Sequence, residues 1–245
     1  RDSITSKDLL TPNALKVLYG EIWKMIGVMP EDHYVLELGA GVGDSLDYYP
    51  PEIRSKIIPL DKHQSLLDAF VIKHKPVSTI CTDFFKLGEF QRDPKLKFST
   101  CLGTNAIHFA KNCADLEKLF RGIDGFLDFN SINDKKTILH IFDGGAPDGG
   151  LEIEDIEVLS AQILGELGYT SELIPIEIEV LTHRSNLNEV QKTVLSDRFF
   201  AGNNFLGSGP DGMYVYEQPG INENFVIEKL ECHLLHAEKL VKFLL

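Results

Sequence analysis

The sequence predicts an α/β protein with a doubly wound, mostly parallel seven-stranded sheet. Strand-like apolar runs alternate with segments of helical periodicity along the chain, and short turns join them. No internal repeat or low-complexity linker interrupts this alternation. At 245 residues, the chain is long enough for one well-buried domain of this class and too short for two.

Short apolar runs bounded by turn residues are predicted as the strands of this sheet. They cover residues 34–38, 55–61, 77–85, 98–107, 136–142, 173–181 and 213–217. Pro59 is unexpected inside the second run, because proline removes a ladder hydrogen bond and is normally confined to sheet edges or bulges.

Helices are predicted between the strands from apolar residues spaced three and four positions apart. The clearest face is formed by Leu116, Leu119, Phe120 and Ile123. The predicted helices cover residues 44–49, 64–74, 115–126, 153–167 and 224–245, and residues 3–28 have a partly helical rhythm.

Three regions follow from these elements. Residues 1–30 are expected to form an N-terminal helical cover, residues 31–220 the α/β domain, and residues 221–245 a C-terminal helix. The apolar content of that last helix exceeds what one exposed helix needs. We therefore expect it to pack on the core or on a partner subunit, where it would be the contact of an oligomer.

The composition is that of an acidic globular protein, with a net charge of −13 and a pI near 5.0. This balance argues against tight, sequence-independent binding of phosphate chains, which needs a basic surface. The four cysteines form no C-x-x-C pair, so neither a metal site nor a disulfide framework is expected. No apolar run reaches the length of a membrane span and no signal peptide is visible, so a cytoplasmic location is expected.

The most informative stretch is the glycine loop, Glu37-Leu38-Gly39-Ala40-Gly41-Val42-Gly43, which follows the first strand. Glycine lacks a Cβ atom, so it turns with positive φ and lets a ligand approach the backbone closely. Dinucleotide-binding loops instead read G-x-G-x-x-G. The carboxylate of Glu37 suits an ammonium group and would repel a pyrophosphate. Spacing and charge therefore favour S-adenosylmethionine over NAD.

This loop resembles motif I of the class I S-adenosylmethionine-dependent methyltransferases, an apolar strand followed by (D/E)-x-G-x-G-x-G. The resemblance covers residues 30–145 and is only topological beyond them. It implies a Rossmann-like methyltransferase fold with an antiparallel last strand, and residues 31–220 as the methyltransferase domain. It also implies S-adenosylmethionine as cofactor and S-adenosylhomocysteine as product.

Two further acids extend this interpretation. Asp61 ends the second strand 24 positions after Glu37, where a carboxylate can accept both ribose hydroxyls. The resemblance implies that Asp83 takes the adenine amino group and that Phe84 covers the ring. The alternative for both acids is an ordinary polar residue in a turn. The predicted cofactor-binding residues are Glu37, Gly39, Ala40, Gly41, Gly43, Asp61, Lys62, Asp83, Phe84 and Asn105.

Asn105, His108 and Phe109 are the predicted catalytic residues, because they follow the fourth strand, whose carboxyl end should face the transferable methyl. His108 could orient an acceptor or take its proton, and Phe109 could stack on a flat acceptor. The alternative is a buried histidine and a core aromatic. The irregular segment 186–212 is interpreted either as part of an acceptor lid or as a surface excursion.

The leading functional hypothesis is methyl transfer to nitrogen or oxygen of a small or medium-sized acceptor, with a small molecule favoured over RNA. Residues 106–109 also resemble an element of the RNA cap guanine-N7 methyltransferases, which makes that activity the first alternative. A second alternative is a cofactor-binding but inactive partner subunit. An NAD-dependent oxidoreductase is the most distant one.

Overall fold

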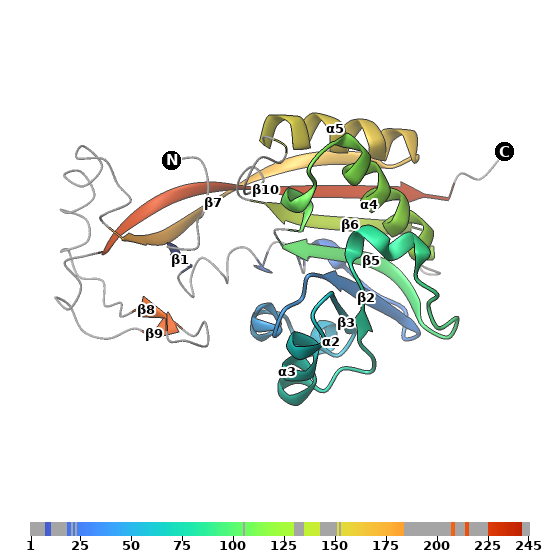
Figure 1. The fold of residues 1–245 in the computed structure, drawn as a ribbon, viewed down its shortest axis with the longest axis horizontal. Coiled ribbons are helices and arrows are strands. Elements are labelled where there is room, and N and C mark those ends of the chain that lie inside the picture. Colours follow the sequence, from blue (N-terminus) through green and yellow to red (C-terminus); the bar gives the residue numbers. More distant parts are fainter. Residues whose placement is uncertain are drawn as a thin grey trace.

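The computed structural model describes residues 8–10, 19–20, 22, 24–104, 106–129, 135–142, 151, 153–183, 207–208, 214–215 and 225–241. Within them, a central sheet lies between two layers of helices (Figure 1). Its strands are β1 (Asp8–Leu10), β2 (His33–Leu38), β3 (Ile57–Asp61), β4 (Ile80–Cys81), β5 (Lys97–Thr104), β6 (Lys135–Phe142), β7 (Thr170–His183) and β10 (Phe225–Leu240).

The strand order in space is β1-β7-β10-β6-β5-β2-β3-β4. Neighbouring strands from β4 to β6 run parallel, whereas β10 runs antiparallel to both β6 and β7. Apart from the short edge strand β1, this is a seven-stranded sheet whose last strand is antiparallel and lies between the fifth and sixth. The predicted fold class is confirmed.

In the described parts of the chain, seven helical elements lie between the strands, and residues 19–20, 22 and 24–26 are helical as well. Predicted helix 64–74 is confirmed at both ends. The helix predicted over residues 115–126 begins two residues earlier, at Cys113, because Asn112 caps it by accepting the N–H of Asp115. Gly168, with a φ of 85°, follows the last helix. The elements are η1 (Asp44–Tyr48), α2 (Pro51–Arg54), α3 (Gln64–His74), η2 (Phe84–Glu89), η3 (Ile107–Phe109), α4 (Cys113–Phe126) and α5 (Ile153–Glu166).

The predicted C-terminal helix is wrong, because residues 225–240 form strand β10 in the middle of the sheet. Cys232 and Leu234 pack in the core on one face, and Leu235 and Ala237 pack on the other. A strand buried on both faces loses the alternation of apolar and polar residues, so its pattern cannot be distinguished from that of a buried helix. Residues 225–240 are therefore part of the sheet and do not form the helix that was expected to contact the core or a partner.

Two other predictions at the sheet's periphery are wrong in part, because residues 19–20, 22 and 24–26 are helical and residues 214–215 do form a strand. Residues 8–10 form β1, which pairs with β7, and not part of a helical cover. In the predicted strand 213–217, Tyr214 and Val215 form β9, which pairs with β8 (Gly207–Ser208) in a separate small sheet. Most of residues 186–212, predicted as a lid or surface excursion, lies outside the described residues.

The unexpected Pro59 lies where its missing N–H does no harm. In β3 the carbonyl groups of Lys56 and Leu60 accept hydrogen bonds from β2 and the following loop, so the backbone of Pro59 faces the other side. On that side β4 pairs only with Leu60 and Asp61. Pro59 therefore opposes no ladder acceptor in β4.

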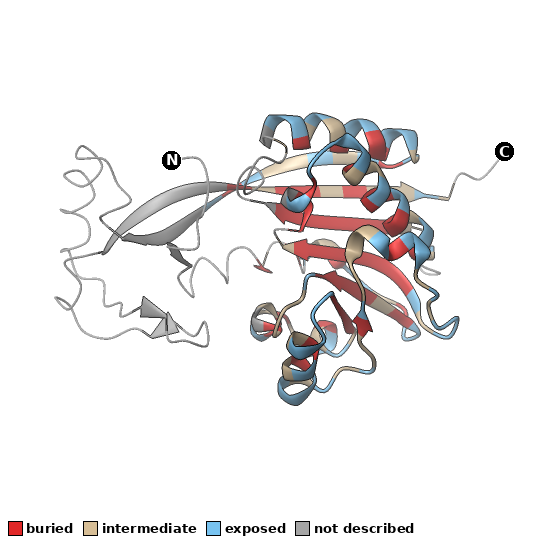
Figure 2. Ribbon diagram, viewed as in Figure 1, coloured by how far each residue is buried: buried red, intermediate tan, exposed pale blue. Residues whose placement is uncertain are grey.

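Two apolar cores pack against the faces of the sheet. One lies beneath α4 and α5, and the other lies beneath the helical residues 19–26, η1 and α2. Figure 2 shows that β5 and β6 are buried along most of their length, while the covering helices are exposed on their outer sides. Because β2 pairs in parallel with both β3 and β5, the carboxyl ends of these three strands meet at one edge of the sheet. Ligands of open α/β folds bind at this edge.

Beyond that edge, β7 and β10 form a projecting arm, defined as residues 176–183 and 225–232 (Figure 1). β6 pairs with β10 only over His233–Leu240, so the arm extends past the carboxyl end of β6. β1 pairs with the arm at Val180–Thr182 and widens it to three strands. The N-terminal segment thus contacts both the arm and, through residues 19–26, the body of the domain.

Candidate functional site

A hollow of about 430 Å³ lies at the carboxyl end of β2. The glycine loop forms most of its wall, and the rest comes from the N-terminal helical residues, η1, α3 and β5. The lining residues are Tyr19, Glu37, Leu38, Gly39, Ala40, Gly41, Val42, Ser45, Leu66 and Thr104. The hollow therefore lies at the position expected for a ligand of this fold.

The glycine loop depends on left-handed backbone conformations. Gly39 and Gly41 have φ values of 63° and 55°, and a Cβ atom on either would meet no atom within 4 Å. The open space beside them lets a ligand approach the main chain. Gly43 serves packing instead, because a Cβ there would lie 2.6 Å from the ring of Phe70. This glycine allows α3 to pack against the loop.

Glu37 is a buried carboxylate in the wall of the hollow, with 5% of its surface exposed. The hydroxyl of Ser45 donates a hydrogen bond of 2.7 Å to its Oε1 atom. Its Oε2 atom has no hydrogen-bond partner among the described residues. Burial raises the pKa of Glu37 to about 7, although the bond from Ser45 acts in the opposite direction. A cationic group would satisfy the unpaired oxygen and favour the ionised carboxylate.

Asp61 ends β3 and braces the glycine loop from the neighbouring strand. Its Oδ2 atom accepts the N–H of Gly41 at 3.1 Å, and its Oδ1 atom accepts the N–H of His63 at 2.9 Å. A carboxylate oxygen has two lone pairs, so each oxygen keeps one further acceptor site. Asp61 lies next to the lining residues without being one of them, and Lys62 is exposed beside it.

Asp83, Phe84 and Phe109 lie along the same edge, beyond β4 and β5. Asp83 caps η2 by accepting the N–H of Phe85 at 3.0 Å. The ring centroids of Phe84 and Phe109 are 6.5 Å apart, and 51% of Phe109 is exposed. Phe109 is therefore not the core aromatic of the alternative interpretation. Asn105 and the side chain of His108 lie outside the described residues.

Sequence reasoning did not identify Tyr19, Ser45, Leu66 and Thr104 as lining residues. Tyr19 stacks on Tyr48 at 5.8 Å and meets Tyr49 edge-on at 5.4 Å, which holds the N-terminal helical residues against η1. Only Ser45 carried a local signal, because it follows the last glycine of the loop by two positions. The others come from distant segments that tertiary packing brings together.

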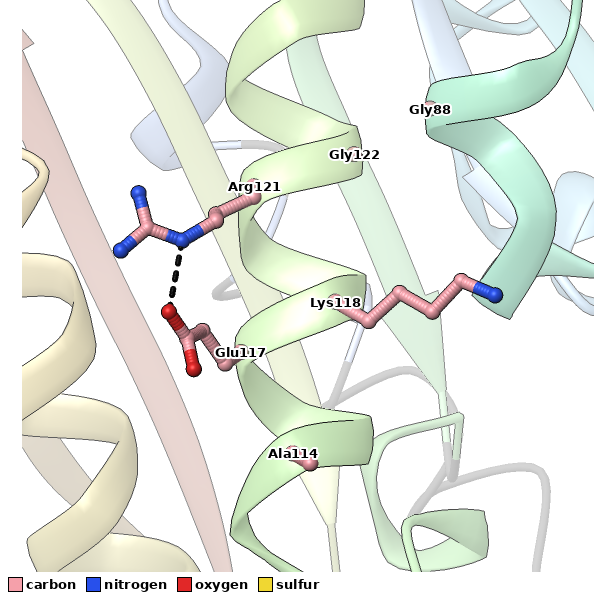
Figure 3. A pocket seen from close by; sticks show the side chains of 6 residues that line it. All are labelled: Gly88, Ala114, Glu117, Lys118, Arg121 and Gly122. Atoms are coloured by element: carbon pink, nitrogen blue, oxygen red, sulfur yellow. Dashed lines mark hydrogen bonds and ion pairs between the residues drawn. The ribbon is translucent and has the colours of Figure 1, made fainter.

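A second hollow of about 400 Å³ lies between α4 and η2 (Figure 3). Its charged walls are already paired, since Arg121 bonds Glu117 at 2.8 Å and Lys118 bonds Glu89 at 3.1 Å. None of the predicted site residues lines it; the lining residues are Gly88, Ala114, Glu117, Lys118, Arg121 and Gly122. The hollow at the glycine loop is therefore the candidate site.

Within the described part of the chain, no three His, Cys, Asp or Glu side chains are grouped as a metal site would require. None of the helices described there has the length and hydropathy of a membrane span.

Comparison with known proteins defines the class of fold. No family model and no curated protein matches the sequence. The YcgJ protein of Bacillus subtilis superposes with a TM-score of 0.53 at 13% identity, over 91% of this chain and 97% of that one. A candidate methyltransferase of Bacillus halodurans gives 0.50 at 15% identity, over 91% and 99%. The precorrin-6y C5,15-methyltransferase of Geobacter metallireducens gives 0.50 at 12% identity, over 97% and 95%.

At these identities the likeness concerns the fold. Strand order, the antiparallel last strand and the solved structures agree: the chain has the Rossmann-like fold of the class I S-adenosylmethionine-dependent methyltransferases.

Proposed function

We propose that the protein is an S-adenosylmethionine-dependent methyltransferase whose cofactor binds in the hollow at the glycine loop. The observation that carries this proposal is Glu37, a buried carboxylate in the wall of the hollow whose Oε2 atom has no described partner. Leaving a buried acceptor unsatisfied costs about 1–3 kcal/mol, so the site is suited to a ligand with a cationic donor. The ammonium of a methionine moiety is such a donor.

The residues present fit this cofactor. Glu37 would hold the ammonium directly or through water, and the open backbone at Gly39 and Gly41 would admit the ligand. Asp61 retains acceptor sites for ribose hydroxyls, while Asp83 and Phe84 follow the third parallel strand, where the adenine would lie. The bound cofactor would supply a methyl group activated by a sulfonium.

The chain's own contribution is to orient the acceptor. Little more is required, because alignment of the reacting atoms supplies much of the rate when the donor is activated. The exposed ring of Phe109, close to Phe84 at this edge, suits a flat acceptor. The acidic charge supports a small or medium-sized acceptor over RNA. The proposed transfer is to a nitrogen or oxygen atom of that acceptor.

Calorimetry with S-adenosylhomocysteine tests the proposal. The wild-type protein should bind with micromolar affinity, and Glu37→Gln should weaken binding about tenfold to a hundredfold, because the neutral amide removes a charge-assisted hydrogen bond. Glu52→Gln, an exposed change in the first turn of α2, is the matched control and should bind like the wild type. A folded wild-type protein that binds no S-adenosylhomocysteine would contradict the proposal.

The acceptor is then sought with isotope-labelled S-adenosylmethionine and a panel of amines, phenols and carboxylates. An RNA cap analogue in the same panel tests the guanine-N7 alternative. Cofactor binding without turnover on any acceptor would favour the inactive partner subunit instead, and competition by NADH would favour an oxidoreductase.

A further inference from the structure

We infer that Ser45 is a positioning residue, whose hydroxyl holds Glu37 through Oε1 and keeps Oε2 available for the ammonium group of the ligand. The inference rests on the proposed function and deepens it. It makes Ser45 a determinant of selectivity for ligands that carry an amino-acid moiety. Two oxygens of one carboxylate thus have different tasks, one structural and one for the ligand.

Local geometry brings Ser45 to this position. Gly43, with a φ of 81°, caps η1, and its carbonyl accepts the N–H of Leu46 at 3.2 Å. Ser45 follows Glu37 by eight residues in sequence, and this turn brings its hydroxyl oxygen to 2.7 Å from the Oε1 atom of Glu37. Ser45 also lines the hollow, so the bond lies within the site.

The bond from Ser45 is the hydrogen bond that the described residues give to the Glu37 side chain. Without it, neither buried carboxylate oxygen would have a partner among the described residues to fix its orientation. The lining residues include no lysine or arginine in the described chain, and the nearby titratable groups are the phenols of Tyr19 and Tyr49. Among the described residues Glu37 has no cationic partner, so the site is suited to a ligand that brings a cationic group.

Two ligands separate positioning from a general structural role. S-adenosylhomocysteine carries the amino-acid moiety, whereas 5′-methylthioadenosine has the same nucleoside and thioether without it. Ser45→Ala should weaken binding of S-adenosylhomocysteine about tenfold at pH 7 and leave 5′-methylthioadenosine within about twofold of the wild type. Ser45→Thr keeps a hydroxyl and should restore the affinity. Ser55→Ala, at an exposed position outside the hollow, is the matched control.

The pH profile gives a second readout. Since the bond from Ser45 lowers the pKa of Glu37, its loss should move the midpoint for S-adenosylhomocysteine binding to higher pH. Binding of 5′-methylthioadenosine should show no such shift. Ser45→Cys, a near-isosteric change to a weaker donor, should give an intermediate affinity and is measured in case Ser45→Ala does not fold.

The outcomes distinguish this inference from the proposed function. If the wild type binds both ligands and the Ser45 variants weaken both equally, the positioning role is overturned while the cofactor site remains. If the folded wild type binds neither ligand, both proposals fail. Selective loss of S-adenosylhomocysteine with rescue by threonine supports the inference.

Discussion

At the scale of single residues, burial of the Glu37 carboxylate destabilises the folded protein when that group is ionised. Its pKa of about 7 in the folded protein lies above the value near 4.5 that an exposed glutamate has. In the intervening pH range the folded state therefore holds a proton that the unfolded state has released. The contribution of Glu37 to stability therefore falls as pH rises through this range, by about 3 kcal/mol in total. The free protein is less stable for having a site suited to a cation.

Denaturation by urea at several pH values checks this effect. Glu37→Gln removes the titrating group, so its unfolding free energy should gain on that of the wild type between pH 5 and pH 8, by about 2–3 kcal/mol. Saturating S-adenosylhomocysteine should raise the stability of the wild type more than that of the variant. Parallel pH curves for the two proteins would show that Glu37 does not titrate in this range.

At the scale of elements, the sequence predicted what is encoded locally. Helix 64–74 and the glycine loop have signals within their own residues, namely apolar spacing and the positions of Glu37, Gly39 and Gly41. The C-terminal strand β10 has no such signal, because its partners β6 and β7 lie far away in sequence and bury both of its faces. Tyr19 was missed for the same reason, since its place at the site depends on packing against η1.

A close pairing between β5 and β6 gives a prediction at this scale. Gly103 lies opposite His140, and a Cβ at position 103 would lie 2.5 Å from the histidine ring. That ring is fully buried against Phe120, and burial lowers the pKa of His140 to about 3, so it is neutral at physiological pH. Position 103 therefore suits glycine, because the ring of His140 occupies the space that a Cβ atom would need.

Gly103→Ala should therefore destabilise the fold by about 1–3 kcal/mol through overpacking. Gly125→Ala is the matched control, because its Cβ in helix α4 would meet no atom within 4 Å, and alanine favours the helix by about 0.5–1 kcal/mol. Thermal denaturation of the two variants should shift in opposite directions. Equal behaviour would contradict the close packing between Gly103 and His140.

At the scale of the whole molecule, Asp124 joins elements that are distant in sequence. From α4, its carboxylate accepts hydrogen bonds from Lys136 of β6 at 3.2 Å, from Lys239 of β10 at 3.0 Å and from Tyr169, which precedes β7, at 3.0 Å. Burial alone would raise the pKa of Asp124, but the bond from Lys239 and the charge of Lys136 lower it. This contribution to stability is present at neutral pH and is lost on acidification.

Asp124→Asn keeps the shape and removes the charge, so it should destabilise the protein by about 1–2 kcal/mol at pH 7, a range that allows for partial exposure. The difference should shrink below about pH 4, where the aspartate is protonated. Asp68→Asn on the exposed side of α3 is the control and should change the unfolding free energy by less than about 0.5 kcal/mol. An Asp124 variant as stable as this control would show that the network does not tie the sheet together.

The central position of β10 in the sheet also affects how the chain folds during its synthesis. Before residues 225–240 have been synthesised, β6 and β7 are complete but lack β10, the strand that lies between them in the sheet. During translation the nascent chain therefore exposes one unpaired edge of β6 and one of β7, and these edges can pair with strands of other chains. A chain truncated before residue 225 should therefore be insoluble, whereas a chain that includes residues 225–240 can fill the position between β6 and β7.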